Sequence, residues 1–393
     1  CGVQATGGIS TDWEKVSEDW DRMGFPIAVC RADGSFELTK PADTGGRIAP
    51  ETVAEQIVYE IGDPAAYLLP DVTCDFRQVK LEQTGERRVR ITGARGRAPT
   101  GSYKVSATYQ DGFRSSGTMM IGGIDAVKKA EAVAAAILKR TRRMFQQRGM
   151  ADYLRTDVEV LGSESNWGAQ SRRRDTREVI LKLSVHHADK AALEIFGREF
   201  IPPATAMAQG ITGFSGGRPT PTPLVRLFSC LVPKTAVQVE IDGKPFAPPA
   251  PAGTGSVGDS TARSEQASSS SVPAGRPLPP RAGGRKMPLI ALAYGRSGDK
   301  GNAANIGVLA RKPEFVPLLR EQLTAAAVKD YFRHFAHGEV ERFEIPGLNG
   351  FNFLLHDALG GGGMASLRYD PQGKMLAQIL MDFEIIVPEH FSP

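Results

Sequence analysis

One low-complexity segment, from Phe246 to about Lys286, divides the chain of 393 residues into two parts. It reads PPAPAGTGSVGD, then SEQASSSS, then RPLPPRAGGRK, and holds almost no large apolar side chain. Such a segment cannot bury enough apolar surface to offset the entropy of ordering it, so residues 246–286 are expected to be a disordered, flexible linker. A role as a proline-rich ligand is the alternative. The chain is therefore expected to fold as residues 1–245 and residues 287–393.

The composition is that of a soluble globular protein, with 41% apolar and 23% charged residues. The net charge of +4 comes from basic residues spread along the chain, so nucleic acid is not an expected partner. No apolar run reaches the ~18–20 residues that cross a bilayer, and no leader opens the chain, so no membrane association is expected. The cysteines lie far apart without a CxxC pair, which predicts no metal site and a cytoplasmic location: Cys1, Cys30, Cys74 and Cys230.

Residues 1–245 alternate helical and extended patterns, which predicts an α/β (mixed α+β) region. Apolar residues at helical spacing predict helices at Pro50–Ile61, Ala126–Gln147 and Lys190–Glu199. Alternating segments separated by glycine-containing turns predict an antiparallel meander between residues 77 and 121.

Two glycine-rich segments of this region are candidate anion sites. Lys40, Thr44, Gly45 and Gly46 precede the helix that starts at Pro50, where backbone amides and a lysine could hold a phosphate or carboxylate. The alternative is a plain strand-to-helix turn with an exposed lysine. Arg218 ends a second glycine-rich run, in which the following prolines also suit a rigid surface connection.

His186 and His187 close an extended segment at Glu178–Val185. Adjacent residues of a strand point to opposite faces, so the two histidines cannot easily share a metal. Structural roles are expected for both, although histidine is well suited to proton transfer.

The stretch Leu289–Arg311 joins two apolar, strand-like runs through a polar segment with two glycines. This loop has the materials of an anion cradle, because its glycines can turn backbone amides toward one point while a lysine adds charge. Its residues are Ser297, Gly298, Asp299, Lys300, Gly301 and Asn302. The alternative is a tight turn in which the glycines take positive φ.

The rest of the second part predicts two helices and further strands. A long helix is expected around Glu314–Phe335, a strand at Val340–Ile345, and a second helix over Pro346–Leu359 that ends in Gly360–Gly363. Strands are expected to follow at residues 365–369 and 375–387. This order predicts an α+β domain of the ferredoxin-like kind. Lys300 is expected to project near Gly361 and Gly362, with His356 close by.

Three segments together resemble the acyclic terpene utilisation family (AtuA). They are TKPADTGGRIAPETVAEQIVYEIGDPAAYLLPDV at Thr39–Val72, SGDKGNAANIGVLAR at Ser297–Arg311 and LGGGGMASLRYDPQGKMLAQ at Leu359–Gln378. The resemblance implies an N-terminal α/β domain, a C-terminal ferredoxin-like domain, and work in the catabolism of acyclic terpenes such as citronellol and geraniol or of branched acyl-CoA compounds. It also implies a chain that begins partway into the first domain. The family brings no assigned catalytic residues.

Two functions follow as hypotheses. The first is a lyase- or hydratase-like enzyme acting on an acyl-CoA thioester or a terpenoid acid, with Lys300, Lys40 and Arg218 holding phosphate or carboxylate and His356 or Asp299 carrying protons. No cofactor is implied beyond the CoA moiety of such a substrate. The second is a non-catalytic accessory subunit for acyl-CoA carboxylase or hydratase partners, since no nucleophile–base, metal or dinucleotide signature is present. A homo-oligomer is compatible with both.

Overall fold

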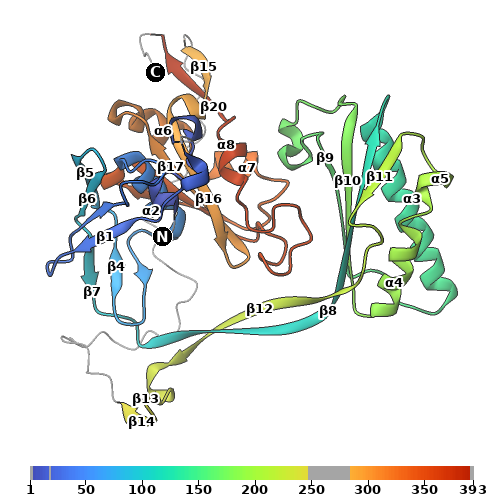
Figure 1. Cartoon of the computed structure of the whole chain (residues 1–393), viewed down its shortest axis with the longest axis horizontal. Coiled ribbons are helices and arrows are strands. Elements are labelled where there is room, and N and C mark those ends of the chain that lie inside the picture. Colours follow the sequence, from blue (N-terminus) through green and yellow to red (C-terminus); the bar gives the residue numbers. More distant parts are fainter. Residues whose placement is uncertain (1–2, 17–18, 247–283, 390–393) are drawn as a thin grey trace.

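A computed structural model describes residues 3–16, 19–246 and 284–389 (Figure 1). Most of the linker expected at residues 246–286 lies outside the described residues, at 247–283. Its described ends are not disordered, because Phe246 ends the strand Lys244–Phe246 and residues 284–286 belong to the strand Gly284–Pro288. Within the described ranges, no helix is long and apolar enough to cross a membrane. The mixed α+β fold class is confirmed.

An antiparallel sheet in the order β16-β17-β19-β18 forms the centre of the C-terminal domain. Its strands are β16 (Ala293–Lys300), β17 (Ala303–Ala310), β18 (Val340–Ile345) and β19 (Gly350–Leu355). One face carries Ile306, Phe351 and Phe353 into a core shared with α6 (Val316–Gln322), α7 (Ala325–Tyr331) and α8 (Leu376–Leu380). At one side, β15 (Gly284–Pro288) pairs with β20 (Glu384–Pro388).

The other face of this sheet is covered by α2 (Pro50–Glu60), which comes from the first part of the chain. The contact is close, because a Cβ atom on Gly307 would collide with Val58. Val58 shares a buried cluster with Leu309 and Ile345 of the sheet. The N-terminal segment and the C-terminal domain therefore form one body across the linker.

Two small sheets complete this body. The first runs in the order β1-β2-β6-β5 and the second in the order β3-β4-β7. The remaining N-terminal helix is α1 (Trp13–Val16). The strands are β1 (Ile27–Cys30), β2 (Phe36–Thr39), β3 (Tyr67–Leu68), β4 (Thr73–Asp75), β5 (Lys80–Gly85), β6 (Arg88–Thr92) and β7 (Arg95–Arg97).

The middle of the chain forms a separate module, at the right of Figure 1, with its own core. Its elements follow the order β-α-β-β-α-β, and its antiparallel sheet has the order β11-β8-β10-β9, which is a ferredoxin-like arrangement. They are β8 (Ser102–Gly122), α3 (Ala126–Gln147), β9 (Arg155–Leu161), β10 (Glu178–His187), α4 (Lys190–Glu199) and β11 (Ile211–Ser215). The short helix α5 (Pro203–Ala206) lies between α4 and β11. Helices α3 and α4 cover one face of the sheet, and the opposite face looks toward the C-terminal domain (Figure 1).

A two-stranded ribbon connects the two bodies. It consists of the first half of β8 and of β12 (Thr222–Pro233), which pair from Ser102 and Pro233 onward (Figure 1). Beyond it lies the hairpin of β13 (Val239–Ile241) and β14 (Lys244–Phe246).

The predicted helices of the first part are confirmed, since α3 and α4 have the predicted bounds and α2 ends one residue early. Several predictions in the second part were wrong. The segment at 297–302 is no loop: strand β16 continues to Lys300, and Gly301 and Asn302 alone make the turn. The hexapeptide is polar because both faces of the strand find polar partners here, Ser297 on the α8 side and Lys300 on the α2 side.

The predicted helix over Pro346–Leu359 has only a short 3-10 turn at Pro346–Leu348 and is mainly strand β19, whose alternate residues Phe351, Phe353 and Leu355 enter the core. The long helix expected around 314–335 is broken, because Thr324 caps a new helix with its side chain on the amide of Ala327. Leu376–Leu380 is the helix α8 rather than strand, and residues 365–369 form a loop without strand structure.

Candidate functional site

The predicted anion loop is built into the contact between α2 and the sheet. The ammonium group of Lys300 donates to the carbonyl oxygen of Tyr59 at 2.9 Å, near the C-terminal end of α2. Burial lowers the pKa of Lys300. A lysine at this position satisfies one of the free carbonyls of the helix end and complements the helix dipole. The cation therefore already has an oxygen partner within the fold.

Two fully buried asparagines support the same helix end. Asn305 donates its amide to the carbonyl of Val58 at 2.8 Å, and Asn352 donates to the carbonyls of Ile61 and Gly62 at 2.7 and 2.6 Å. These polar residues hold the first part of the chain on the C-terminal sheet.

The expected proximity of the hairpin turn and the glycine-rich run is found. The amide of Gly361 donates to the side-chain oxygen of Asn302 at 2.7 Å, and a Cβ atom on Gly362 would lie 3.0 Å from the carbonyl oxygen of Gly301. Gly360, Gly361 and Gly362 all have positive φ, which explains the need for glycine in this close approach.

The two predicted proton carriers are not brought together. Asp299 lies on β16 opposite Ala304 of β17, and Ala304 lies opposite Leu355 of β19. His356 follows Leu355 and pairs with Glu341 of β18 at 2.7 Å, at the far edge of the sheet. Asp299 is instead 3.7 Å from Lys374. Ser297 accepts from the amide of Ala377, and Gly298 packs against Tyr59.

The other predicted anion-binding residues lie elsewhere. Lys40 is buried and donates to the carbonyl of Thr44 within its own loop. Gly45 and Gly46 are packed against Asp19 and Thr6, which leaves no room for a side chain. Arg218 is exposed between β11 and β12, in the middle module. Lys40, Lys300 and Arg218 thus do not converge on one ligand.

The run that begins with Gly360 continues across the open face of the middle module. Arg155 donates to the carbonyls of Gly360 and Ala365, the second at 2.6 Å. Arg114 donates to the carbonyl of Met364 at 3.0 Å, and Lys182 to that of Leu367 at 2.6 Å. We call residues 360–369 the cover loop, because they lie over the polar side chains of this face.

Strand register explains why these side chains gather. Residues of β10 with odd numbers enter the core of the module, so Lys182, Ser184 and His186 point to the open face. Their neighbours on β9 are Glu159, Asp157 and Arg155, in the same order. This face of the sheet therefore brings basic and acidic groups into one row that ends at a histidine.

His186 has the geometry of a base. It is 2% exposed, and its Nε2 atom lies 2.7 Å from the carbonyl oxygen of Asp111. A carbonyl only accepts, so Nε2 carries the proton and Nδ1 holds a lone pair. Nδ1 is buried and has no partner among the described residues. Burial lowers the pKa of His186, which favours the neutral imidazole.

Charged groups around His186 are only partly satisfied. Arg226 is paired with Asp111, and Lys182 lies 2.8 Å from Glu159. Burial raises the pKa of Glu159, whose Oε2 also accepts from the amide of Tyr369. Three buried atoms have no hydrogen-bond partner among the described residues: Nε of Arg155, Oδ1 of Asp157 and Oε1 of Glu159. Unpaired polar atoms in one buried place are costly and are a usual sign of a functional site.

The sequence did not point to this cluster. Its members are scattered from Asp111 to Tyr369, and the strand pattern predicted a structural role for His186. That role is seen for His187, which faces the core and packs against Phe145 and Tyr153. The alternation of polar residues at 182, 184 and 186 was the available signal.

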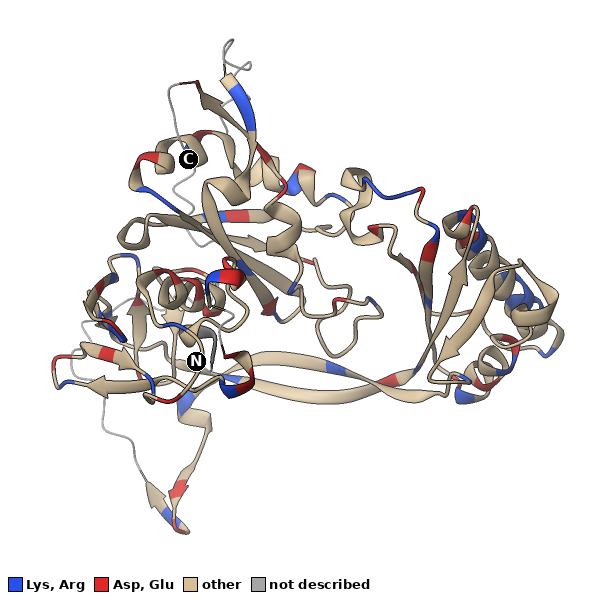
Figure 2. Cartoon of the chain, turned by 45° about the horizontal axis from the view of Figure 1, so that its top comes forward, with Lys and Arg blue, Asp and Glu red and all other residues tan. Residues whose placement is uncertain are grey.

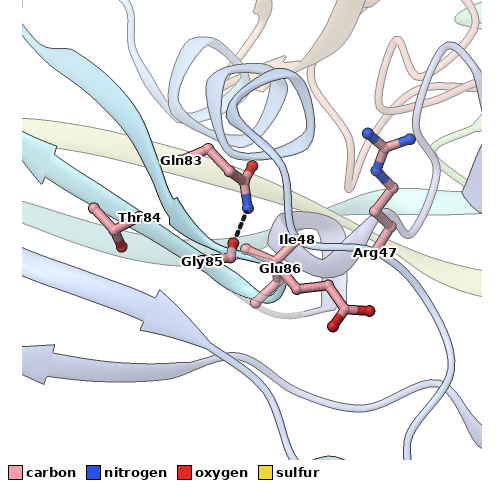
Figure 3. Close-up of a pocket in the computed structure, with 6 residues that line it drawn as sticks. All are labelled: Arg47, Ile48, Gln83, Thr84, Gly85 and Glu86. Carbon is pink, nitrogen blue, oxygen red and sulfur yellow. Dashed lines mark hydrogen bonds between the residues drawn. The ribbon is translucent and has the colours of Figure 1, made fainter.

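A shallow hollow of about 460 Å³ lies on the N-terminal body (Figure 3). It is lined by Arg47, Ile48 and residues 83–86, and Gln83 donates to the carbonyl of Gly85 at 2.6 Å. Its ionisable groups are the guanidinium of Arg47 and the carboxylate of Glu86, and no histidine lines it, so the hollow does not offer a pair of proton-transfer groups. No group of metal-ligating side chains is found in the part of the chain that the structure describes.

Comparisons with known proteins match both parts of the chain. Residues 1–242 match the model of the acyclic terpene utilisation family protein AtuA, and residues 287–386 match the AtuA ferredoxin-like domain. No curated protein and no solved structure matches. Both matches confirm the resemblance expected from the sequence. Since the first alone covers more than half of the residues, the chain belongs to the acyclic terpene utilisation family AtuA.

Proposed function

We propose that this chain serves acyclic terpene utilisation as an acid–base enzyme that acts on a branched acyl-CoA thioester or terpenoid acid at the interface under the cover loop. The observation that carries the proposal is His186, a buried neutral imidazole with a free Nδ1 lone pair among arginine, lysine and carboxylate groups. Family membership supports the terpene setting, and the chemistry of the site supports the reaction class.

The proposed step is the removal of a proton from a carbon activated by the thioester or carboxylate carbonyl. His186 Nδ1 accepts the proton, the electron pair of the C–H bond forms a C=C bond to the carbonyl carbon, and the π pair of the carbonyl moves onto its oxygen. Arg155, beside His186 in the strand register, would stabilise the negative charge on that oxygen, and Lys182, four residues along β10, would hold a more distant anionic group of the substrate. Both now donate to carbonyls of the cover loop, so substrate binding requires the loop to lift and the anionic group to replace those carbonyls.

Hydrogen exchange into the substrate tests this function. The intact protein is incubated with geranyl-CoA in D₂O, and deuterium uptake is followed by mass spectrometry. His186→Gln removes the base, and the expected exchange rate falls by about 10²- to 10⁴-fold, the usual contribution of a general base.

The matched control is His356→Gln, which removes a histidine from the edge of the C-terminal sheet and should leave exchange unchanged. If His356→Gln abolishes exchange and His186→Gln does not, the base was assigned to the wrong residue. If the unmodified protein exchanges no hydrogen of the thioester or of the free acid, the enzymatic proposal fails.

The second candidate is an accessory subunit that docks onto an acyl-CoA carboxylase, and it is favoured by the ribbon of β8 and β12. Val105 and Tyr109 alternate on one face of β8, and Phe228 of β12 stands opposite Ala107 between them. These three large side chains are 39%, 51% and 56% exposed. Figure 2 shows the ribbon with few charged residues. Capture of the carboxylase by the intact chain, and its loss in Phe228→Asp, would support this role.

A further inference from the structure

Arg296, on β16, is the most isolated buried charge on the α2 side of the C-terminal sheet. It faces α2, because Gly307 lies opposite it on β17 and packs against Val58. Its residue is 5% exposed, and neither Nη1 nor Nη2 has a hydrogen-bond partner among the described residues. A guanidinium has five N–H donors and stays charged in proteins, so two free ends in a buried place are energetically costly.

The nearest acidic side chain is already engaged. Glu55, one helical turn before Tyr59, accepts from the hydroxyl of Ser10 at 3.0 Å and from the amide and hydroxyl of Thr11 at 2.9 and 3.0 Å. Both of its oxygens are used, and no ion pair within 4.0 Å joins it to Arg296. Glu55 therefore acts on the guanidinium of Arg296 through its electrostatic field but makes no hydrogen bond to either Nη atom.

Two lysines share the ring of Tyr59 with Arg296. The guanidinium of Arg296 lies 5.0 Å from the centre of the Tyr59 ring, and the ammonium groups of Lys374 and Lys300 lie 4.4 and 5.5 Å from it. Lys374 also donates to the hydroxyl of Tyr59. The side chain of Lys374 is 37% exposed, so solvent reaches the outer end of this group. Asp299, 3.7 Å from Lys374, and Glu60 offset the charge of these cations through space. No carboxylate of the described residues hydrogen-bonds to either Nη atom of Arg296, so these buried donors still lack a partner that a negative ligand would supply.

We propose that Arg296, Tyr59 and Lys374 form a binding site for an oxyanion, a carboxylate or a phosphate, that enters beside Lys374. The two Nη groups of Arg296 match the two oxygens of such a group, with Lys374 and the hydroxyl of Tyr59 as further donors. Lys300 does not belong to the site as a ligand, because its ammonium is held by the C-terminal end of α2. The site lies on the α2 face of the sheet and does not depend on His186.

Thermal unfolding of the intact chain tests this site. Inorganic phosphate is used in one series and 3-methylbut-2-enoate in the other, each against potassium chloride at the same ionic strength. Stabilisation by phosphate alone, by the carboxylate alone, or by both supports the site and identifies which oxyanion it takes. Arg296→Lys keeps the charge but loses the planar pair of donors, and the affinity should fall by about 10- to 100-fold.

Arg296→Met separates a ligand site from a structural role. Removing an unpaired buried charge should leave the unliganded protein equally stable or more stable, while the response to the anion is lost. The matched control is Arg342→Met, since Arg342 also packs on an aromatic ring but donates to the carbonyls of Arg320 and Leu323. This variant should unfold at a lower temperature and keep its anion response. The proposal is overturned if neither anion stabilises the unmodified protein beyond the chloride control, or if Arg296→Met keeps the full response.

Discussion

At the scale of single residues, both proposed sites rest on charged or titratable side chains with one end satisfied and the other free. His186 is held by a backbone carbonyl through Nε2, and Arg296 by the ring of Tyr59. Among the other buried charged side chains of the described ranges, Glu159 has an ion pair, and Lys40 and Glu55 have hydrogen-bond partners. Arg311 shows the contrast, because it makes two hydrogen bonds to Asp12, at 2.8 and 2.5 Å, and so ties the N-terminal segment to the end of β17.

The Asp12–Arg311 pair predicts a specific pH dependence of stability. The hydrogen bond from Arg311 is the main cause that lowers the pKa of Asp12 from 3.8 to about 2. A lowered folded-state pKa gives stability that is present above pH 3.8 and is lost as the pH falls from 3.8 toward 2. Asp12→Asn should therefore cost about 1–2 kcal/mol near neutral pH, after allowance for solvent screening, and almost nothing at pH 2.

Denaturant unfolding at several pH values measures this difference. Glu344→Gln is the control, because its pair with Arg320 is nearly half exposed and should contribute little at any pH. A stability loss for Asp12→Asn that stays constant down to pH 2 would contradict the assignment.

At the scale of elements, the helices that were predicted from the sequence are those with a clear apolar stripe and a defined start. Ala126–Gln147 and Lys190–Glu199 have both features, and their bounds agree with the structure. The second part was harder, because strands covered on both faces lose the simple alternation of apolar and polar residues. β16 carries Arg296 and Lys300 on the face covered by α2, which lies more than 230 positions earlier in the chain, and both side chains contact Tyr59 there. Periodicity within a window cannot reveal such a neighbour, so the hexapeptide was interpreted as a loop.

The packing of α2 on this sheet predicts how one added methyl group, at Gly307, changes the stability of the protein. A Cβ atom on Gly307 would collide with Val58, so Gly307→Ala must push α2 away from β17. The expected cost is about 1–3 kcal/mol, the usual range for overpacking, with faster amide exchange in Pro50–Glu60. Gly62→Ala is the matched control, because no atom lies within 4 Å of a Cβ there and its φ is not positive. Equal stability of the two variants would show that α2 does not pack as described.

At the scale of the whole molecule, the chain forms two bodies joined by the ribbon and by the cover loop. The first body combines the N-terminal segment with the C-terminal domain, and the second is the middle module (Figure 1). The ribbon is a two-stranded element, which is weak as a spacer on its own. The contacts of Arg155, Arg114 and Lys182 with the cover loop therefore help to hold the bodies together. The segment between β9 and β10 adds a second contact, in which Trp167 donates to Asp382 at 3.1 Å and packs against the C-terminal core. This placement of a candidate site between bodies could not be predicted from sequence, because it depends on tertiary contacts between residues more than 180 positions apart.

Arg155 is the residue whose removal should loosen this contact most, since it bonds two carbonyls of the cover loop. Hydrogen bonds to charged groups contribute about 1.5–3 kcal/mol each, so Arg155→Ala should raise the opening of the loop by about 10- to 100-fold. Amide exchange of residues 360–369 measures that opening, and the exchange of α3 and α4 should stay as it is because their core does not contain Arg155. Arg142→Ala is the control, as its pair with Asp152 lies on the exposed side of α3. If the cover loop exchanges at the same rate in Arg155→Ala and in the unmodified chain, other contacts hold the bodies together and the loop is not the gate to His186.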